Sequence, residues 1–213
     1  MNYEEVKVGP AALAGELRLP AQPRGLVVLA DGSVARRDAL RHRVVARLLG
    51  RQRIATLLVD LLTPQEASAS GAEAGALVHR LARRLLQAIE WVRKQPALAA
   101  LPVGLFATGE AAAAAVIAAA ERPAEVAAIV TRAGRLDGVA AELSRLRAPT
   151  LLVVGALDAE VLADNLEAQR AIPGEHRLHV VPRATRLFEE AGALEQVADA
   201  SADWFEAHLV HRR

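Results

Sequence analysis

The sequence predicts an α/β protein in which helices cover both faces of a mostly parallel, eight-stranded sheet, giving three layers. The first observation is a series of short apolar runs, such as residues 26–30 and 150–154, each typical of a strand buried on both faces. The second is that amphipathic stretches such as residues 77–94 separate these runs, with apolar side chains at helical spacing. Strands that alternate with helices of this length indicate parallel crossover connections.

The first two strands are expected where polar and apolar side chains alternate on either side of Gly9-Pro10, as in a half-exposed antiparallel hairpin. The expected strands are residues 3–8, 14–19, 26–30, 54–59, 103–106, 126–131, 150–154 and 176–181. Helices are expected at residues 36–50, 77–94, 136–146, 159–170 and 194–209, and after a sharp turn at residues 107–111. Residues 63–75 lack a clear pattern and are expected to form a mobile loop. Few residues follow strand 126–131 before the next helix, so no lid domain is expected there. The length of the chain is typical of one α/β domain, so residues 1–213 are expected to form a single domain.

Composition excludes several classes of function. The chain of 213 residues is 53% hydrophobic and 3% aromatic, so aliphatic side chains and alanine are expected to form its core. Its net charge of +1 gives no electrostatic reason to expect nucleic acid or an anionic membrane as a partner. The absence of cysteine excludes disulfides, thiolate catalysis and cysteine-based metal sites, and no cofactor is expected. Residues 1–5 do not begin a signal peptide and no apolar run reaches about 18 residues, so a cytoplasmic protein is expected. The bias toward alanine and arginine is typical of bacterial genes rich in G and C.

The segment of residues 101–123 contains the junction on which a functional interpretation depends. A short apolar run, residues 103–106, enters a sharp corner at residues 107–111 and continues into an alanine-dominated helix that stops at Arg122-Pro123. A strand, a tight turn and a helix in this order form the nucleophile elbow of α/β-hydrolases, where a G-x-S-x-G pattern exposes a serine. The central position of this corner is Gly109, which has no side chain that could attack a substrate.

Together with the elbow, four other stretches resemble the dienelactone-hydrolase-like branch of the α/β-hydrolase superfamily, over roughly residues 24 to 209. They are GLVVLADGS at residues 25–33, ATLLVDLLT at residues 55–63, APTLLVVGALD at residues 148–158 and VPRATRLFEE at residues 181–190. The resemblance implies an α/β-hydrolase fold and a nucleophile at 109, an acid at 158 and a base at 186. Only the acid, Asp158, is present, because Gly109 replaces serine and Arg186 replaces histidine. The two missing groups are those that perform covalent attack and proton transfer.

Ligands of open α/β sheets bind outside the carboxyl ends of the strands, so the residues there are the candidate site. They are Asp31, Ser33, Asp60, Thr108, Gly109, Glu110, Arg132, Asp158 and Arg186. If the elbow turn is retained, position 109 has a positive φ, which glycine adopts without strain. The missing side chain could also let an anionic ligand approach the backbone N–H groups at the start of the following helix.

The charged groups of this set have structural interpretations beside functional ones. Asp158 and Arg186 are expected to face each other as a partly buried ion pair, which could instead grip a carboxylate or phosphate ligand. Glu110 suits the first turn of a helix. A carboxylate cluster for Mg²⁺ would need Asp31 and Asp60 to join Glu110 or Asp158, and the sequence has no spacing motif for a metal.

The hydroxyl groups and the histidines do not supply an evident replacement for the missing triad members. Ser33 and Thr108 are the hydroxyls nearest the expected site, and neither has a recognisable histidine partner. Surface or packing roles are expected for all six histidines, which are His42, His79, His176, His179, His208 and His211.

These observations favour a non-hydrolytic binding or scaffold module whose ligand is a small molecule, with an anion as one candidate. The alternative is a hydrolase or lyase that acts on a small ester or lactone through Asp31, Glu110 or Asp158. A third interpretation is a deliberately altered sequence on the same scaffold. The sequence is compatible with a homodimer through an edge strand or the terminal helix, and it singles out neither.

Overall fold

The computed structural model describes residues 3–31, 36–68 and 74–210, and it does not cover the side chains of residues 31, 36–40, 67–68 and 74. Eight strands form one sheet in the order β1-β2-β4-β3-β5-β6-β7-β8. Their bounds are β1 Tyr3–Val8, β2 Leu13–Arg18, β3 Gly25–Asp31, β4 Ile54–Asp60, β5 Val103–Thr108, β6 Val126–Arg132, β7 Thr150–Gly155 and β8 His176–Val181. The β1–β2 hairpin and the β2–β4 pair are antiparallel, and the other neighbours are parallel. The predicted mostly parallel sheet is therefore confirmed, strand for strand.

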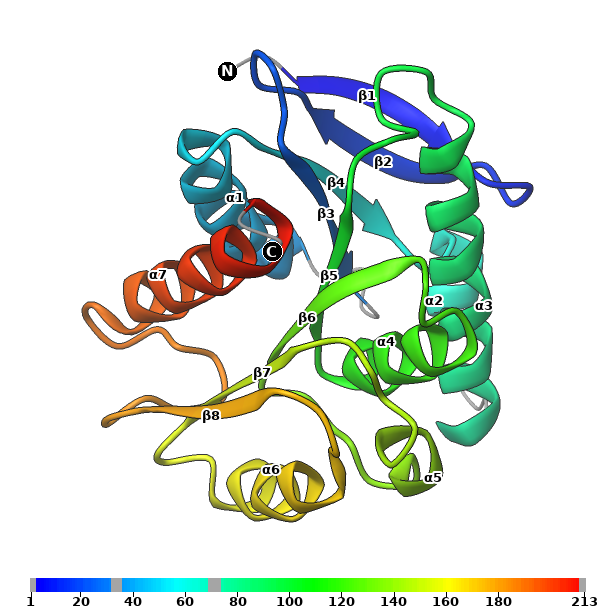
Figure 1. Cartoon of the computed structure of the whole chain (residues 1–213). Helices are drawn as coiled ribbons and strands as arrows, with labels where there is room; N and C mark the ends of the chain where they lie inside the picture. The colour runs from blue at the N-terminus through cyan, green and yellow to red at the C-terminus, as the bar shows by residue number, and fades with distance from the viewer. Residues whose placement is uncertain (1–2, 32–35, 69–73, 211–213) are drawn as a thin grey trace.

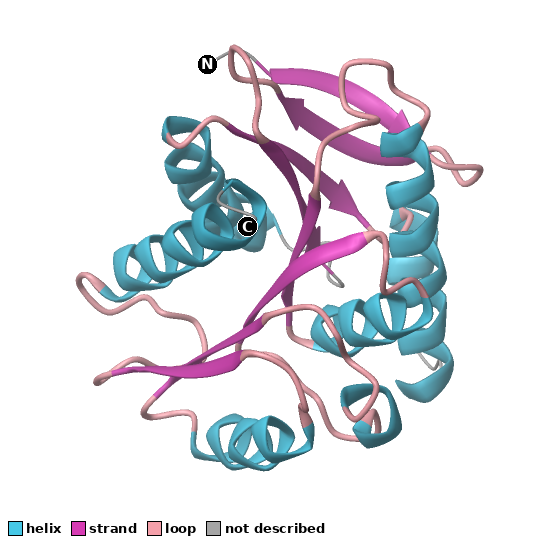
Figure 2. Ribbon diagram, viewed as in Figure 1, coloured by secondary structure: helices cyan, strands magenta, loops and turns pink. Residues whose placement is uncertain are grey.

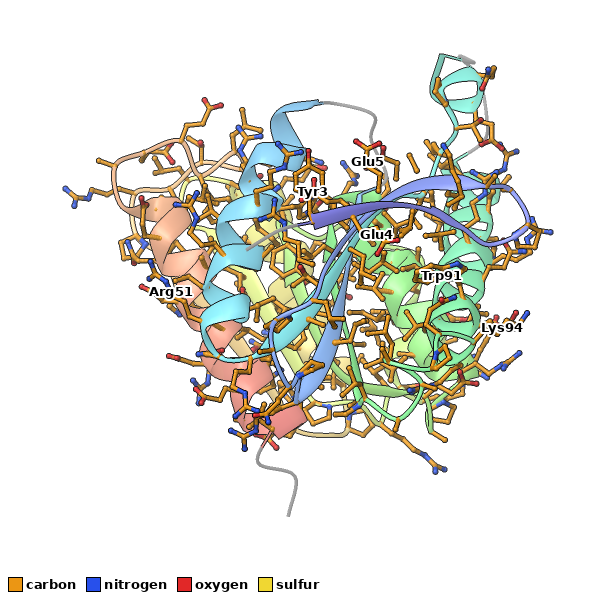
Figure 3. The ribbon with its side chains drawn as sticks, turned by 90° about the horizontal axis from the view of Figure 1, so that it is seen from above. Tyr3, Glu4, Glu5, Arg51, Trp91 and Lys94 are labelled. Carbon is orange, nitrogen blue, oxygen red and sulfur yellow. The ribbon has the colours of Figure 1, made fainter. Side chains whose placement is uncertain are left out.

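Helices lie on both faces of the sheet, as the ribbon shows (Figures 1 and 2). Their bounds are α1 Arg36–Arg51, α2 Pro64–Ser68, α3 Ala74–Arg93, α4 Glu110–Glu121, α5 Ala140–Leu143, α6 Ala159–Ala171 and α7 Ala193–Phe205, followed by a π-helical turn at Glu206–Val210. One apolar core joins the sheet to α3, α4, α5 and α6, and a second joins it to α1, α7 and the π-helical turn. The view from above separates α1 and α7 on one side from α3 and α4 on the other (Figure 3).

Two sequence predictions about the connections are wrong. The helix expected at residues 136–146 is only α5, because Gly138 has a φ of 82° and the N–H of Leu136 is bonded to the Asp164 carboxylate at 2.8 Å. The loop expected at residues 63–75 contains α2. Thr63 and Glu66 cap that helix reciprocally, since the Thr63 N–H donates to the Glu66 carboxylate at 2.9 Å and the Glu66 N–H donates to the Thr63 hydroxyl at 3.3 Å.

The helix α4 follows the sheet closely because its side chains are small. All residues from Ala111 to Ala119 are buried, seven of them alanine at the positions that face α3, α5 and the sheet. Figure 1 shows α4 between α3 and α5. This packing fixes the position of the corner at Gly109, from which α4 begins.

Candidate functional site

The corner between β5 and α4 has the backbone geometry of a nucleophile elbow. Gly109 has φ 55° and ψ −127°, a conformation that strains any residue with a side chain. Its carbonyl oxygen accepts hydrogen bonds from the N–H groups of Ala112 and Arg135, both at 3.1 Å. The predicted positive φ is confirmed, and the turn is fixed both by its own helix and by the loop that follows β6.

The described residues leave the space above the corner open. A Cβ atom built on Gly109 would have none of their heavy atoms within 4 Å beyond its chain neighbours. Among the described residues there is therefore room at this position for a side chain.

Four of the candidate residues form one row across the carboxyl edge of the sheet. In the strand register Asp60 lies opposite Asp31, Asp31 opposite Thr108, and Thr108 opposite Arg132. Neighbouring strands lie about 4.8 Å apart, so the row brings these four backbone positions together beside the elbow. Thr108 and Arg132 are buried, at 7% and 4% exposure. The side chain of Asp31 and the whole of Ser33 lie outside the described residues.

Asp60 ends this row at a distance from the elbow. It borders a separate cavity beside the N-terminal hairpin, together with Glu16 and Arg43. Burial raises the pKa of the Asp60 carboxyl from its ordinary value of 3.8.

The ion pair expected between Asp158 and Arg186 is absent from the part of the chain that the structure describes. Asp158 lies immediately before α6, and its Oδ2 atom is buried with no hydrogen-bond partner among those residues. Arg186 is exposed to solvent in the loop after β8. The prediction of a partly buried pair is therefore wrong, because the guanidinium of Arg186 points to solvent and leaves the carboxylate of Asp158 unneutralised.

The loop after β8 has a conformation that explains the exposure of Arg186. Arg183 and Phe188 have positive φ values of 58° and 53°, and the Phe188 ring is buried in the core under the loop. Glu189 in the same loop forms an ion pair with Arg41 of α1, at 2.7 Å. Hydrogen bonds from Thr185 lower the pKa of the Glu190 carboxyl. These contacts attach the loop to α1 and to itself, with Arg186 on its outer side.

A cavity of 430 Å³ lies beside the elbow, and we call it the Glu110 cavity. Its apolar wall consists of Val78 from α3, Ala113 and Ile117 from α4, and Val139 before α5. Glu110, which follows the elbow directly, is exposed and lines its mouth.

Other polar side chains line the same cavity, and the sequence did not indicate them as site residues. They are His79, Arg135, Asp137 and Glu142. Arg135 forms ion pairs with Asp137 at 3.6 Å and with Glu160 at 3.5 Å. Arg135, Asp137 and Glu142 follow the carboxyl end of β6, and ligand-binding loops of open sheets occur at such ends. That position was the feature of the sequence that could have indicated them.

The loop at residues 133–139, which forms one side of the Glu110 cavity, is held by α6. The amide of Asn165, fully buried, donates to the Gly134 carbonyl at 2.8 Å, and the Asp164 carboxylate accepts the N–H of Leu136. Gly134 is required at this approach, because a Cβ atom there would lie 2.6 Å from the Cβ of Ala112. The cavity wall is thus preformed.

Of the described histidines, His79 lines the Glu110 cavity, whereas His42 and His179 lie elsewhere. His42 is fully buried and packs edge-on against the Phe106 ring of β5, with ring centroids 5.6 Å apart. His179 lies on β8 in a different cavity, where burial and the nearby Arg177 lower the pKa of its imidazole. Among the described residues no three His, Cys, Asp or Glu side chains are grouped so that they could hold a metal ion.

The fold and the elbow can now be compared with known proteins. The dienelactone hydrolase from Anabaena variabilis ATCC 29413 is 39% identical to this chain, covers 98% of it and 97% of its own length, and superimposes with a TM-score of 0.87. The chain belongs to the dienelactone-hydrolase-like branch of the α/β-hydrolase superfamily. A dienelactone-hydrolase-like promiscuous phosphotriesterase from metagenomic libraries shares the fold, at 20% identity, 97% and 98% coverage and a TM-score of 0.78. No family model matches the sequence.

Longer proteins also match this member of the dienelactone-hydrolase-like branch. Two strains of Mycobacterium tuberculosis each have a protein named "Putative phosphoribosyl transferase" that is 47% identical over 211 residues, or 98% of this chain. The match covers 47% of those proteins, so the chain spans about half the length of the curated relatives it matches. In the described segments no helix combines the length and the apolar character that crossing a membrane requires.

Proposed function

We propose that this dienelactone-hydrolase-like protein binds a small ligand and does not hydrolyse esters. The observation that carries the proposal is Gly109 at the centre of a retained elbow, with open space where a nucleophile would stand. The scaffold that presents the nucleophile in this family is present, and the attacking atom is missing.

The base position supports the same proposal. The guanidinium of Arg186 cannot accept a proton near neutral pH because its pKa exceeds about 12, and its side chain faces solvent. With neither nucleophile nor base, only binding and backbone hydrogen bonds remain, which typically give a rate about 10³ to 10⁴ times that in water. Such a residual rate is too low for a working esterase.

The test is hydrolysis of p-nitrophenyl acetate by the wild type and by the double variant Gly109→Ser, Arg186→His. We expect no wild-type turnover above the residual rate, and labelling by a fluorophosphonate only in variants that contain Gly109→Ser. Gly192→Ser is the matched control, because Gly192 also has a positive φ and open space around its Cβ position among the described residues, and it does not line the Glu110 cavity. Wild-type turnover equal to that of the double variant would overturn the proposal.

One outcome would select the alternative hydrolase or lyase. Wild-type turnover that disappears in Glu110→Ala or Asp158→Ala would indicate acid or base chemistry by these carboxyl groups. Unchanged turnover in Asp31→Ala, Glu110→Ala and Asp158→Ala would remove the support for that alternative.

A second candidate function follows from the longer relatives. Since this chain matches only about half of proteins named phosphoribosyl transferases, we propose that the transfer chemistry named for them belongs to the other half. The present chain would then act as the ligand-binding module of such a protein. Release of pyrophosphate from phosphoribosyl pyrophosphate by the purified chain, above the buffer rate, would contradict this assignment.

A further inference from the structure

The Glu110 cavity has a composition that selects one class of ligand. Its wall is apolar where Val78, Ile117 and Val139 meet, and its volume of 430 Å³ falls within the range of about 300 to 1,000 Å³ that small-molecule sites occupy. An apolar wall of this size favours an organic body over a bare ion, because burial of apolar surface stabilises by about 25 cal/mol per Å².

The charges around this cavity are predominantly negative. Three carboxylates, those of Glu110, Asp137 and Glu142, line it together with the guanidinium of Arg135 and the imidazole of His79. Arg135 forms weak, exposed ion pairs with two carboxylates, Asp137 inside the cavity and Glu160 beside it. Carboxylates therefore outnumber guanidinium groups around the cavity, and an anionic ligand would meet an excess of like charge.

Glu110 and Glu142 are the carboxylates available to a ligand. Glu110 has no ion pair among the described residues. Glu142 forms an ion pair at 3.5 Å with Arg145, whose side chain is 63% exposed, and an exposed pair of this kind is weak. A cationic group placed at the cavity mouth would interact with both carboxylates while its body covers the apolar wall.

We propose that the Glu110 cavity binds a small organic cation, an ammonium group attached to an apolar body. The inference rests on the proposed function, since it names the ligand class of a protein that binds without cleaving. It differs from the expectation of an anionic ligand, which considered the backbone N–H groups at the elbow and the guanidinium of Arg186 and did not consider the carboxylates that line this cavity.

Isothermal titration calorimetry with three probes of the same shape tests the ligand class. Benzylammonium is expected to bind more tightly than uncharged benzyl alcohol, and benzoate is expected to bind least. The preference for benzylammonium should weaken as NaCl rises from 0.1 M to 1 M, because the screening length falls from about 10 Å to about 3 Å. Equal affinity for benzylammonium and benzyl alcohol, tighter binding of benzoate, or no binding of any probe would overturn the proposal.

Variants locate the binding site. Glu110→Gln and Glu142→Gln are each expected to weaken benzylammonium binding about two- to five-fold, the range for a partly exposed ion pair. Glu121→Gln, at the exposed far end of α4, is the matched control and should leave affinity unchanged. Unchanged affinity in both cavity variants would overturn the assignment.

Filling the cavity gives an independent test. Ala113→Leu places extra methyl groups in the apolar wall and should abolish binding while the circular dichroism spectrum stays that of the wild type. If this variant unfolds, the two glutamine variants decide the question. Hydrolysis of p-nitrophenyl acetate by the wild type would refute the proposed function and leave the measured preference for the cation intact, so the two failures can be distinguished.

Discussion

The corner at Gly109 makes a quantitative prediction about stability. Gly109→Ala adds one methyl group in open space, so its effect reports the backbone conformation and not a clash. A residue with a side chain at this φ and ψ is strained by about 1 to 3 kcal/mol. Alanine also restricts the unfolded chain, which offsets about 0.4 to 1 kcal/mol of that loss. The midpoints of these ranges, about 2 and about 0.7 kcal/mol, give an expected net decrease in the free energy of unfolding of about 1.3 kcal/mol.

Urea denaturation followed by circular dichroism at 222 nm measures this decrease. With an m-value of about 2 kcal/mol/M, the midpoint of Gly109→Ala should fall by about 0.5 to 1 M. Gly75→Ala is the matched control, because Gly75 lies in α3, has no positive φ and also has open space. That control should be more stable by about 0.4 to 1 kcal/mol, since alanine favours the helix. A Gly109→Ala variant as stable as the wild type would refute the strained elbow.

Three further predictions concern the packing and charges of the fold. Gly155→Ala should lower the free energy of unfolding by about 3 kcal/mol or more in a urea titration, because the added Cβ would clash with backbone carbonyl oxygens of the loop after β8. The control Gly174→Ala should have little effect, since the nearest atom to its Cβ would lie 3.6 Å away. Glu66→Gln should destabilise the protein above about pH 4.5, because the hydrogen bond from Arg84 lowers the pKa of Glu66 to about 2. The difference in unfolding free energy between the variant and the wild type should disappear as the pH falls from about 4.5 to about 2, in urea denaturation measured at each pH. Asp60→Asn should raise the free energy of unfolding at pH 7 and not at pH 3, because burial raises the pKa of Asp60 and disfavours its charged form. Equal effects of the substitution at both pH values would contradict this reasoning.

The strands and the elbow could be predicted from the sequence because each depends on local information. An apolar run such as residues 150–154 is too short for a buried helix and is bounded by turn residues. The corner at residues 107–111 has small residues on both sides of its centre, and its positive φ follows from the fold in which it occurs. The helix α2 could also have been predicted, since Thr63 and Glu66 have the spacing of a capping box.

The loops that shape the site could not be predicted, because contacts distant in the sequence determine them. The loop before α5 depends on Asp164 and Asn165, 28 and 31 residues further along the chain. The outward position of Arg186 depends on positive φ values at Arg183 and Phe188, and neither residue type indicates such a conformation. The sequence therefore indicated Gly109, Asp158 and Arg186 as the positions that correspond to the triad of the family, and it did not indicate the Glu110 cavity.

The geometry also explains how the fold persists without a serine and a histidine. Glycine at position 109 adopts the elbow conformation without the strain that a serine would have there, so glycine stabilises the corner relative to serine. Arginine at position 186 contributes no buried contact that the sheet requires, because its side chain is exposed and the loop is held by Phe188 and Glu189. Among the described residues the buried Oδ2 atom of Asp158 has no hydrogen-bond partner, and an unsatisfied buried acceptor reduces stability by about 1 to 3 kcal/mol. The fold therefore does not require a serine at 109 or a histidine at 186, and the scaffold is compatible with the binding function proposed above.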